Sequence, residues 1–126
     1  MANRSRDWFA QAERDLAQAK ASQVEGRHEW ACFAAQQSAE MAVKALHLSF
    51  GQQGRGHAVA RLLEDLSLNV THLVDKAKVL DNFYVATRCA SGHPEGAPFE
   101  HYGALQSEKA IRYVGEIVEF VRARLA

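Results

Sequence analysis

Three residues close together in the chain, Tyr84, Arg88 and His93, have side chains that could jointly act on a phosphate. An arginine guanidinium binds phosphate through two parallel hydrogen bonds and stabilises negative charge that builds on it. A histidine can take up or release a proton near neutral pH. Arg88 and His93 are therefore sufficient in type for metal-independent RNA cleavage, in which a ribose 2′-hydroxyl attacks its neighbouring phosphate.

The spacing of Arg88 and His93 sets a condition on the fold. Four residues separate them, so they would not share a face of a straight helix. They could meet only if the helix ends at Arg88 and the following chain folds back at Gly92. The alternative is that Arg88 caps the C-terminal end of its helix, where the macrodipole favours a cation.

A second polar set, Gln37, Glu40 and Lys44, lies inside an otherwise apolar segment, residues 30–50. Buried polar groups need partners. Glu40 and Lys44 stand in the favourable i, i+4 order, so an internal salt bridge that fixes the helix register is the simpler interpretation. A stripe that faces a ligand or an interface is the alternative, and on it Glu40 and Lys44 would be binding residues together with Tyr84.

The segment 30–50 is predicted to be a central helix, because it is apolar nearly all round. One of its sides consists only of small residues, which would let another backbone approach closely. The apolar surface exceeds what one neighbouring helix can cover, so we expect a homodimer with the small residues at the contact. These residues are Ala34, Ala35, Ser38, Ala42 and Ala45.

The remaining periodicity predicts an all-α, up-and-down four-helix bundle with one additional short helix, in a single domain over residues 1–126. Ser5 is expected to cap the first helix, and His57 to begin or cap the third. The glycine-rich segment 51–56 is expected to be a flexible connection, and residues 89–100 a loop without regular structure. The expected helices cover about 5–24, 28–50, 57–66, 72–88 and 101–125.

Composition narrows the class of protein. The chain has 126 residues, with 15 basic and 15 acidic side chains that cancel, so no global field attracts nucleic acid or a membrane surface. No apolar run is long enough to span a membrane, and a soluble, cytoplasmic protein is expected. Cys32, on an apolar helix face, is expected to be a small core residue.

No metal or cofactor is expected. The chain lacks a phosphate-binding glycine loop after a strand, a CxxC pair, HExxH and GxSxG. Its six histidines never share metal-ligand spacing on a helix face. His93 and His101, with Glu95 and Glu100, could assemble a site only through the proximity of a flexible loop.

The order of these motifs resembles the HEPN domains, named for higher eukaryotes and prokaryotes nucleotide-binding. The resemblance covers roughly residues 7–121. It is carried by an aromatic-then-acidic first helix, the central FAAQQSAEMAVKAL, and His57 followed by Leu62 and Leu63. The runs LDNFYVATR, ending at Arg88, and PEGAPFEHY, from residue 94, complete it.

The resemblance implies a bundle of four or five helices that is usually homodimeric. Many bacterial and archaeal members are encoded beside a minimal nucleotidyltransferase, and some such pairs act as toxin and antitoxin. Active members resemble ribonucleases with an Arg-x4–6-His motif, whose two copies face each other across the dimer. Arg88 would hold the scissile phosphate and His93 would transfer or orient a proton. Cys89 and Glu95 depart from the polar residue and the tyrosine found in active motifs.

Three hypotheses follow. The first is a nucleotide- or RNA-binding HEPN protein that is the partner of a minimal nucleotidyltransferase in a toxin–antitoxin-type module. The second is a metal-independent endoribonuclease toxin that uses Arg88 and His93. The third is a purely structural dimerisation module, in which Gln37, Glu40, Lys44 and Arg88 form an internal polar network.

Overall fold

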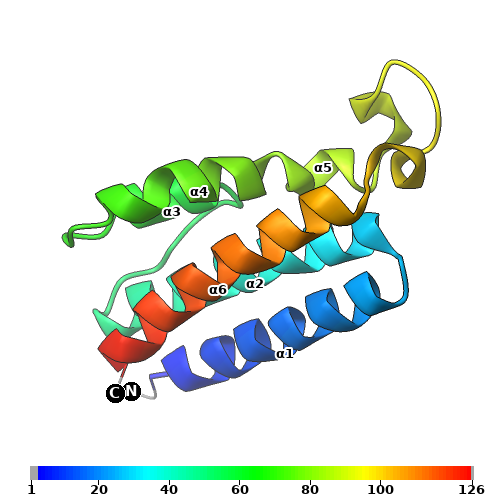
Figure 1. Cartoon of the computed structure of the whole chain (residues 1–126). Helices are drawn as coiled ribbons and strands as arrows, with labels where there is room; N and C mark the ends of the chain where they lie inside the picture. Colours follow the sequence, from blue (N-terminus) through cyan, green and yellow to red (C-terminus); the bar gives the residue numbers. More distant parts are fainter. Residues whose placement is uncertain (1–2, 126) are drawn as a thin grey trace.

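The computed structural model describes residues 3–125, and every regular element within them is helical. Four long helical segments run alternately up and down, with one short helix packed beside them (Figure 1). This confirms the predicted all-α bundle. The elements are α1 (Ser5–Val24), α2 (His28–Ser49), α3 (Val59–Glu64), α4 (Thr71–Asp81), α5 (Phe83–Ala86), the 3₁₀ turns η1 (Ala90–Gly92) and η2 (Pro98–His101), and α6 (Ala104–Leu125).

The central helix α2 is buried, as predicted, but its small-residue side does not form a dimer contact. All five small residues on that side are buried within the single chain. They allow α1 to approach so closely that the Ser38 hydroxyl donates a hydrogen bond of 2.6 Å to the backbone carbonyl of Ala12. The predicted small-residue dimer contact is therefore wrong, because this surface is already covered by α1.

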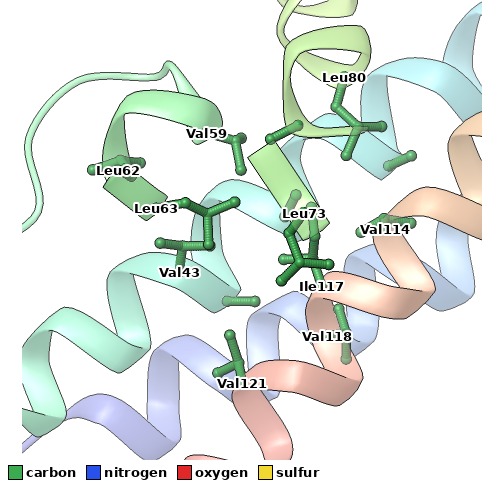
Figure 2. Close-up of a cluster of buried hydrophobic side chains, with 14 of the residues drawn as sticks. Val43, Val59, Leu62, Leu63, Leu73, Leu80, Val114, Ile117, Val118 and Val121 are labelled. Carbon is green, nitrogen blue, oxygen red and sulfur yellow. The ribbon is translucent and has the colours of Figure 1, made fainter. Parts of the chain in front are cut away.

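The hydrophobic core lies where α2, α3, α4 and α6 meet (Figure 2). Branched aliphatic side chains such as Val43, Leu63, Leu73 and Ile117 fill it and exclude water. Cys32 is part of this core, as expected, and burial raises the pKa of its thiol to about 12. In residues 3–125, none of the helices combines the length and apolar character that a membrane crossing needs.

The predicted fourth helix, 72–88, is shorter and interrupted. α4 ends at Asp81, a tight turn passes through Asn82, and α5 ends at Ala86, so Arg88 lies beyond the helix. In the tight turn, the Asn82 N–H donates to the carbonyl of Val79 at 3.3 Å, three residues back. Asn82 has helical dihedral angles, so the helical phase continues through the turn.

Helix ends differ from the sequence predictions because their caps come from elsewhere. Arg4, not Ser5, occupies the N-cap of α1, and Asn3 accepts the Ser5 N–H at 2.8 Å. His57 does not cap α3, because the carboxylate of Asp81 accepts the first two N–H groups of that helix. The last helix begins at Ala104, three residues later than predicted. The segment 89–100 was predicted to lack regular structure, but 3₁₀ turns form at residues 90–92 and 98–101.

The Asp81 cap predicts a pH dependence of stability. Burial, the largest cause, raises the pKa of Asp81, although hydrogen bonds from Val59 and Ala60 oppose the shift. A carboxyl whose folded-state pKa is raised stabilises the fold at low pH, and this contribution is lost as pH rises through that pKa. Asp81→Asn should therefore flatten the pH dependence of the unfolding free energy in urea at pH values above about 4, the ordinary pKa of an aspartate carboxyl.

The matched control is Asp75→Asn on the same helix, where the carboxylate is 96% exposed. This variant should keep the wild-type pH profile. A profile for Asp81→Asn that is parallel to wild type would contradict the assignment.

Candidate functional site

Arg88 is exposed just after α5, and its guanidinium lies over the indole of Trp30 on α2. The guanidinium carbon is 3.9 Å from the ring centroid, a distance at which the cation interacts with the face of the ring. Within residues 3–125, neither an ion pair with a carboxylate nor a side-chain hydrogen bond to a helix-end carbonyl involves Arg88. The helix-capping interpretation thus lacks support, and the N–H groups of Arg88 remain available to a ligand.

Four rings form an aromatic face beside Arg88: Trp30, Phe33, Tyr84 and His57. Trp30 meets Phe33 edge-on at 6.1 Å between centroids, and Phe33 stacks on Tyr84 at 6.3 Å. Tyr84 in turn stacks on His57 at 4.4 Å. α2, α5 and the segment before α3 each supply part of this face, so Tyr84 and Arg88 share a surface, as the sequence suggested.

Glu40 lies at the end of the aromatic face and binds two cationic or protonatable partners. Its side chain is 3% exposed, and the Lys44 ammonium donates to it at 3.0 Å, which confirms the predicted i, i+4 salt bridge. His57 Nδ1 lies 3.2 Å from the same carboxylate and must donate, because a carboxylate only accepts. The amide of Gln36 adds a third contact at 3.3 Å.

Sequence reasoning missed Gln36 and His57 in this network and included Arg88, which is not in it. Gln37 reaches the network only indirectly, because its side-chain amide donates to the side-chain oxygen Oε1 of Gln36 at 2.7 Å. Seventeen positions separate His57 from Glu40, and only the packing of the connection against α2 joins them. No spacing rule for one helix could have found that contact.

His93 is fixed by its own contacts. The chain folds back at Gly92, where an added Cβ would lie 3.1 Å from the Cα of Ala86. His93 Nε2 donates to the Ala86 carbonyl at 2.7 Å, so Nδ1 carries the lone pair. The ring also stacks on His101 at 4.1 Å, with the two planes 2° apart.

The structure therefore brings together some of the predicted site residues but not all of them. Tyr84 and Arg88 share the aromatic face, and Glu40 with Lys44 is linked to it through His57. The His93 side chain instead donates a hydrogen bond to the backbone carbonyl of Ala86 in α5. In the described residues no hydrogen bond joins His93 to Arg88. Across residues 3–125, no three side chains among His, Cys, Asp and Glu are arranged to hold a metal ion.

The sequence and the fold are both similar to those of known proteins. A sequence model of the HEPN domain matches residues 5–124. The crystal structure of TT1696 from Thermus thermophilus is similar, with 45% identity, 97% of this chain and 98% of that chain covered, and a TM-score of 0.93. An archaeal HEPN homologue, ST0689, shows 34% identity, coverage of 99% and 100%, and a TM-score of 0.86.

A HEPN domain protein from Thermotoga maritima, tm0613, is also similar, with 31% identity and a TM-score of 0.74. That comparison covers 94% of this chain and 97% of the other. No curated protein matches the sequence.

Proposed function

The chain belongs to the HEPN domain family, and on this premise we propose that it is a nucleotide- or RNA-binding protein acting with a minimal nucleotidyltransferase in a toxin–antitoxin-type module. The observation that supports binding is the exposed Arg88, held over Trp30 without a carboxylate partner in the described chain. A guanidinium with its plane fixed and its donors free suits phosphate.

The aromatic face would supply the second half of the binding surface. Bases of single-stranded RNA stack on aromatic side chains, each worth about 1–3 kcal/mol, and this stacking tolerates any sequence. His57, with its side chain 55% exposed, offers such a surface on the aromatic face, and Tyr84 supports it by stacking against its ring. Because the whole chain carries no net charge, recognition would rest on this local surface and not on long-range attraction.

We also propose a homodimer in solution, built on a surface other than the small-residue side of α2. Trp30 and Val85 are 40% and 54% exposed, and both are close to Arg88: Trp30 by stacking and Val85 by accepting its backbone N–H. Contiguous exposed apolar surface rimmed by polar groups is typical of interaction sites, and the dimer would bury Trp30 and Val85 together. Sizing of the protein alone tests the homodimer, and elution at the mass of one chain would contradict it. Co-expression with a minimal nucleotidyltransferase, followed by sizing, tests the pairing, and separate elution of the two proteins would contradict it.

Arg88→Ala should weaken binding of a fluorescein-labelled single-stranded RNA at least about tenfold, because each charge-assisted hydrogen bond to phosphate contributes about 1.5–3 kcal/mol. Fluorescence anisotropy at fixed ionic strength measures the effect. Arg88→Lys keeps the charge but loses the planar fork, so it should bind with intermediate affinity.

The control is Arg112→Ala on α6, an exposed arginine whose guanidinium lies 5.5 Å from the ring of Tyr113. It removes the same charge from a similar aromatic contact and should bind RNA as wild type does. If the Arg88 and Arg112 variants lose equal affinity, Arg88 acts only through net charge and the proposed site is wrong.

A second candidate function is metal-independent endoribonuclease activity by Arg88 and His93. The observation that favours it is the hydrogen bond from His93 Nε2 to the Ala86 carbonyl, which leaves Nδ1 as a fixed proton acceptor. Within the described residues of one chain no hydrogen bond joins His93 to Arg88. For this function we propose that the two copies in the dimer face each other, so that Arg88 and His93 act on one phosphate.

A further inference from the structure

A groove of about 640 Å³ runs along α6, which lies between α1 and α4 (Figure 1). α1 supplies Leu16 and Lys20 to its walls, and α4 supplies His72 and Leu73. Along α6 the groove extends from Arg112 to Phe120, a distance of about 12 Å, or roughly two helical turns. The α6 residues that line it are Arg112, Gly115, Glu116, Glu119 and Phe120.

Gly115 lines this groove from the middle of α6. A glycine inside a helix destabilises the helix relative to alanine, because it loses more conformational freedom on folding. The backbone of Gly115 does not require a glycine, since its φ is not positive. Packing does not require one either, because a Cβ built there would meet no side chain and no neighbouring backbone within 4 Å. The missing side chain therefore leaves the helix backbone open to a molecule outside the chain.

Two cations lie close together at one end of the groove. α1 and α6 run antiparallel, as two contacts between them show: Gln23 with Ser107 near one end, and Glu13 with Arg122 near the other. Lys20, three positions before Gln23, is therefore at the level of Arg112 on α6. Both side chains are exposed.

These two cations are not balanced by the carboxylates of the groove. Within residues 3–125, neither Lys20 nor Arg112 forms an ion pair. The two glutamates in the lining are both paired with other cations of the chain, Glu116 with Lys76 at 2.6 Å and Glu119 with Arg122. The free charge of the groove is thus positive, and it is complementary to an acidic partner.

The rest of the surface between these charges is largely apolar. Leu16 is half-buried on the α1 side, and Phe120 is 9% exposed on α6. The ring of Phe120 is held between His72, at 5.8 Å between centroids, and the guanidinium of Arg124, at 3.6 Å. An amphipathic helix lays its apolar side chains into a groove of this kind, at i, i+3, i+4 and i+7 spacing.

We propose that this groove binds an acidic amphipathic α-helix of a partner protein. The apolar side of that helix packs on Leu16 and Phe120 and crosses α6 closely at Gly115, and its carboxylates pair with Lys20 and Arg112. The inference goes beyond the proposed RNA binding, because no residue of the aromatic face lines the groove.

Two fluorescein-labelled synthetic helices of about 18 residues test the proposal, a length at which an isolated helix can form. Both have leucine and alanine on one side; the other side carries glutamate in the first helix and lysine in the second. Fluorescence anisotropy with the wild-type chain should show saturable binding of the glutamate helix, at least about tenfold tighter than that of the lysine helix. Equal binding of the two helices, or no saturable binding of the glutamate helix at millimolar protein, overturns the proposal.

Substitution of Gly115 locates the binding. Gly115→Phe places a ring in the groove and should weaken binding of the glutamate helix at least about tenfold, because it blocks the close approach. Lys109→Phe, at an exposed position of α6 outside the lining, should leave binding unchanged. Gly115→Ala should raise the melting temperature, since the new Cβ meets open space and alanine favours the helix. Equal affinity of the two phenylalanine variants would place the helix elsewhere and overturn the proposal.

Charge reversal tests the partner's chemistry. The double variant Lys20→Glu with Arg112→Glu should prefer the lysine helix, whereas Lys109→Glu should keep the wild-type preference for the glutamate helix. An unchanged preference in the double variant contradicts the proposal. Sedimentation of the protein alone covers the other possible occupant: if Gly115→Phe lowers the mass of the assembly and the glutamate helix does not bind wild type, the groove joins two copies of this chain and the proposal is wrong.

Discussion

Glu40→Ala is expected to lower the free energy of unfolding by about 3–5 kcal/mol. The carboxylate is almost fully buried and serves Lys44, His57 and Gln36 at once. Removing it leaves the Lys44 ammonium, only 13% exposed, without its anion and opens a cavity inside the bundle. Equilibrium unfolding in urea, followed by circular dichroism, measures the change.

The double variant Glu40→Leu with Lys44→Met distinguishes two causes of the lost stability, the unpaired buried charge and the lost packing. Replacing both members of a buried ion pair by apolar residues of similar volume is often neutral or stabilising, so this variant should recover most of the lost stability. A control is Glu116→Ala, whose carboxylate pairs with Lys76 at the surface and should cost less than about 1 kcal/mol. If Glu40→Ala costs no more than this control, the polar stripe of α2 is not structural.

The contrast between Lys44 and His57 shows how far the sequence could predict this network. The Glu40–Lys44 pair follows from helical geometry alone, because residues four apart lie on one face. His57 approaches the same carboxylate only after the connection between α2 and α3 has folded back over α2. Contacts within one element were therefore predictable, and contacts between elements were not.

The same distinction explains the wrong predictions about surfaces and caps. The small-residue side of α2 was correctly predicted to admit a close backbone, but periodicity does not say whether that backbone belongs to α1 or to a second copy. Likewise, the N–H groups that open α3 are satisfied by Asp81, more than twenty positions away. A local capping rule assigned this role to His57, the neighbour in sequence.

The segment 80–93 shows which features of the candidate site could be predicted from the sequence and which could not. The line of side chains from Leu80 to Tyr84 was predictable, because the turn at Asn82 preserves the helical phase. The direction of Arg88 was not, since it depends on the indole of Trp30, supplied by another helix. The fold-back at Gly92 was predictable only as a condition for activity, and its outcome places His93 on Ala86.

On the second candidate function, Arg88→Ala and His93→Gln should each lower the rate of RNA cleavage in EDTA about 10²–10³-fold. His93→Gln is a more specific test of proton transfer than His93→Ala. A glutamine amide can still donate to the Ala86 carbonyl, but it cannot exchange a proton. His101→Ala is the matched control: it removes the stacked neighbour of His93 but leaves the proton acceptor in place.

Two groups that act as one unit lose their joint contribution when either is removed, so the double variant Arg88→Ala with His93→Gln should be no slower than the slower single variant. A further multiplicative loss would mean that the residues act independently and do not meet at one phosphate. Equal cleavage by wild type and all variants would remove both residues from catalysis. RNA binding measured on the same proteins then decides between the two functions, because loss of affinity in Arg88→Ala without any cleavage by wild type is the result expected of a binding protein.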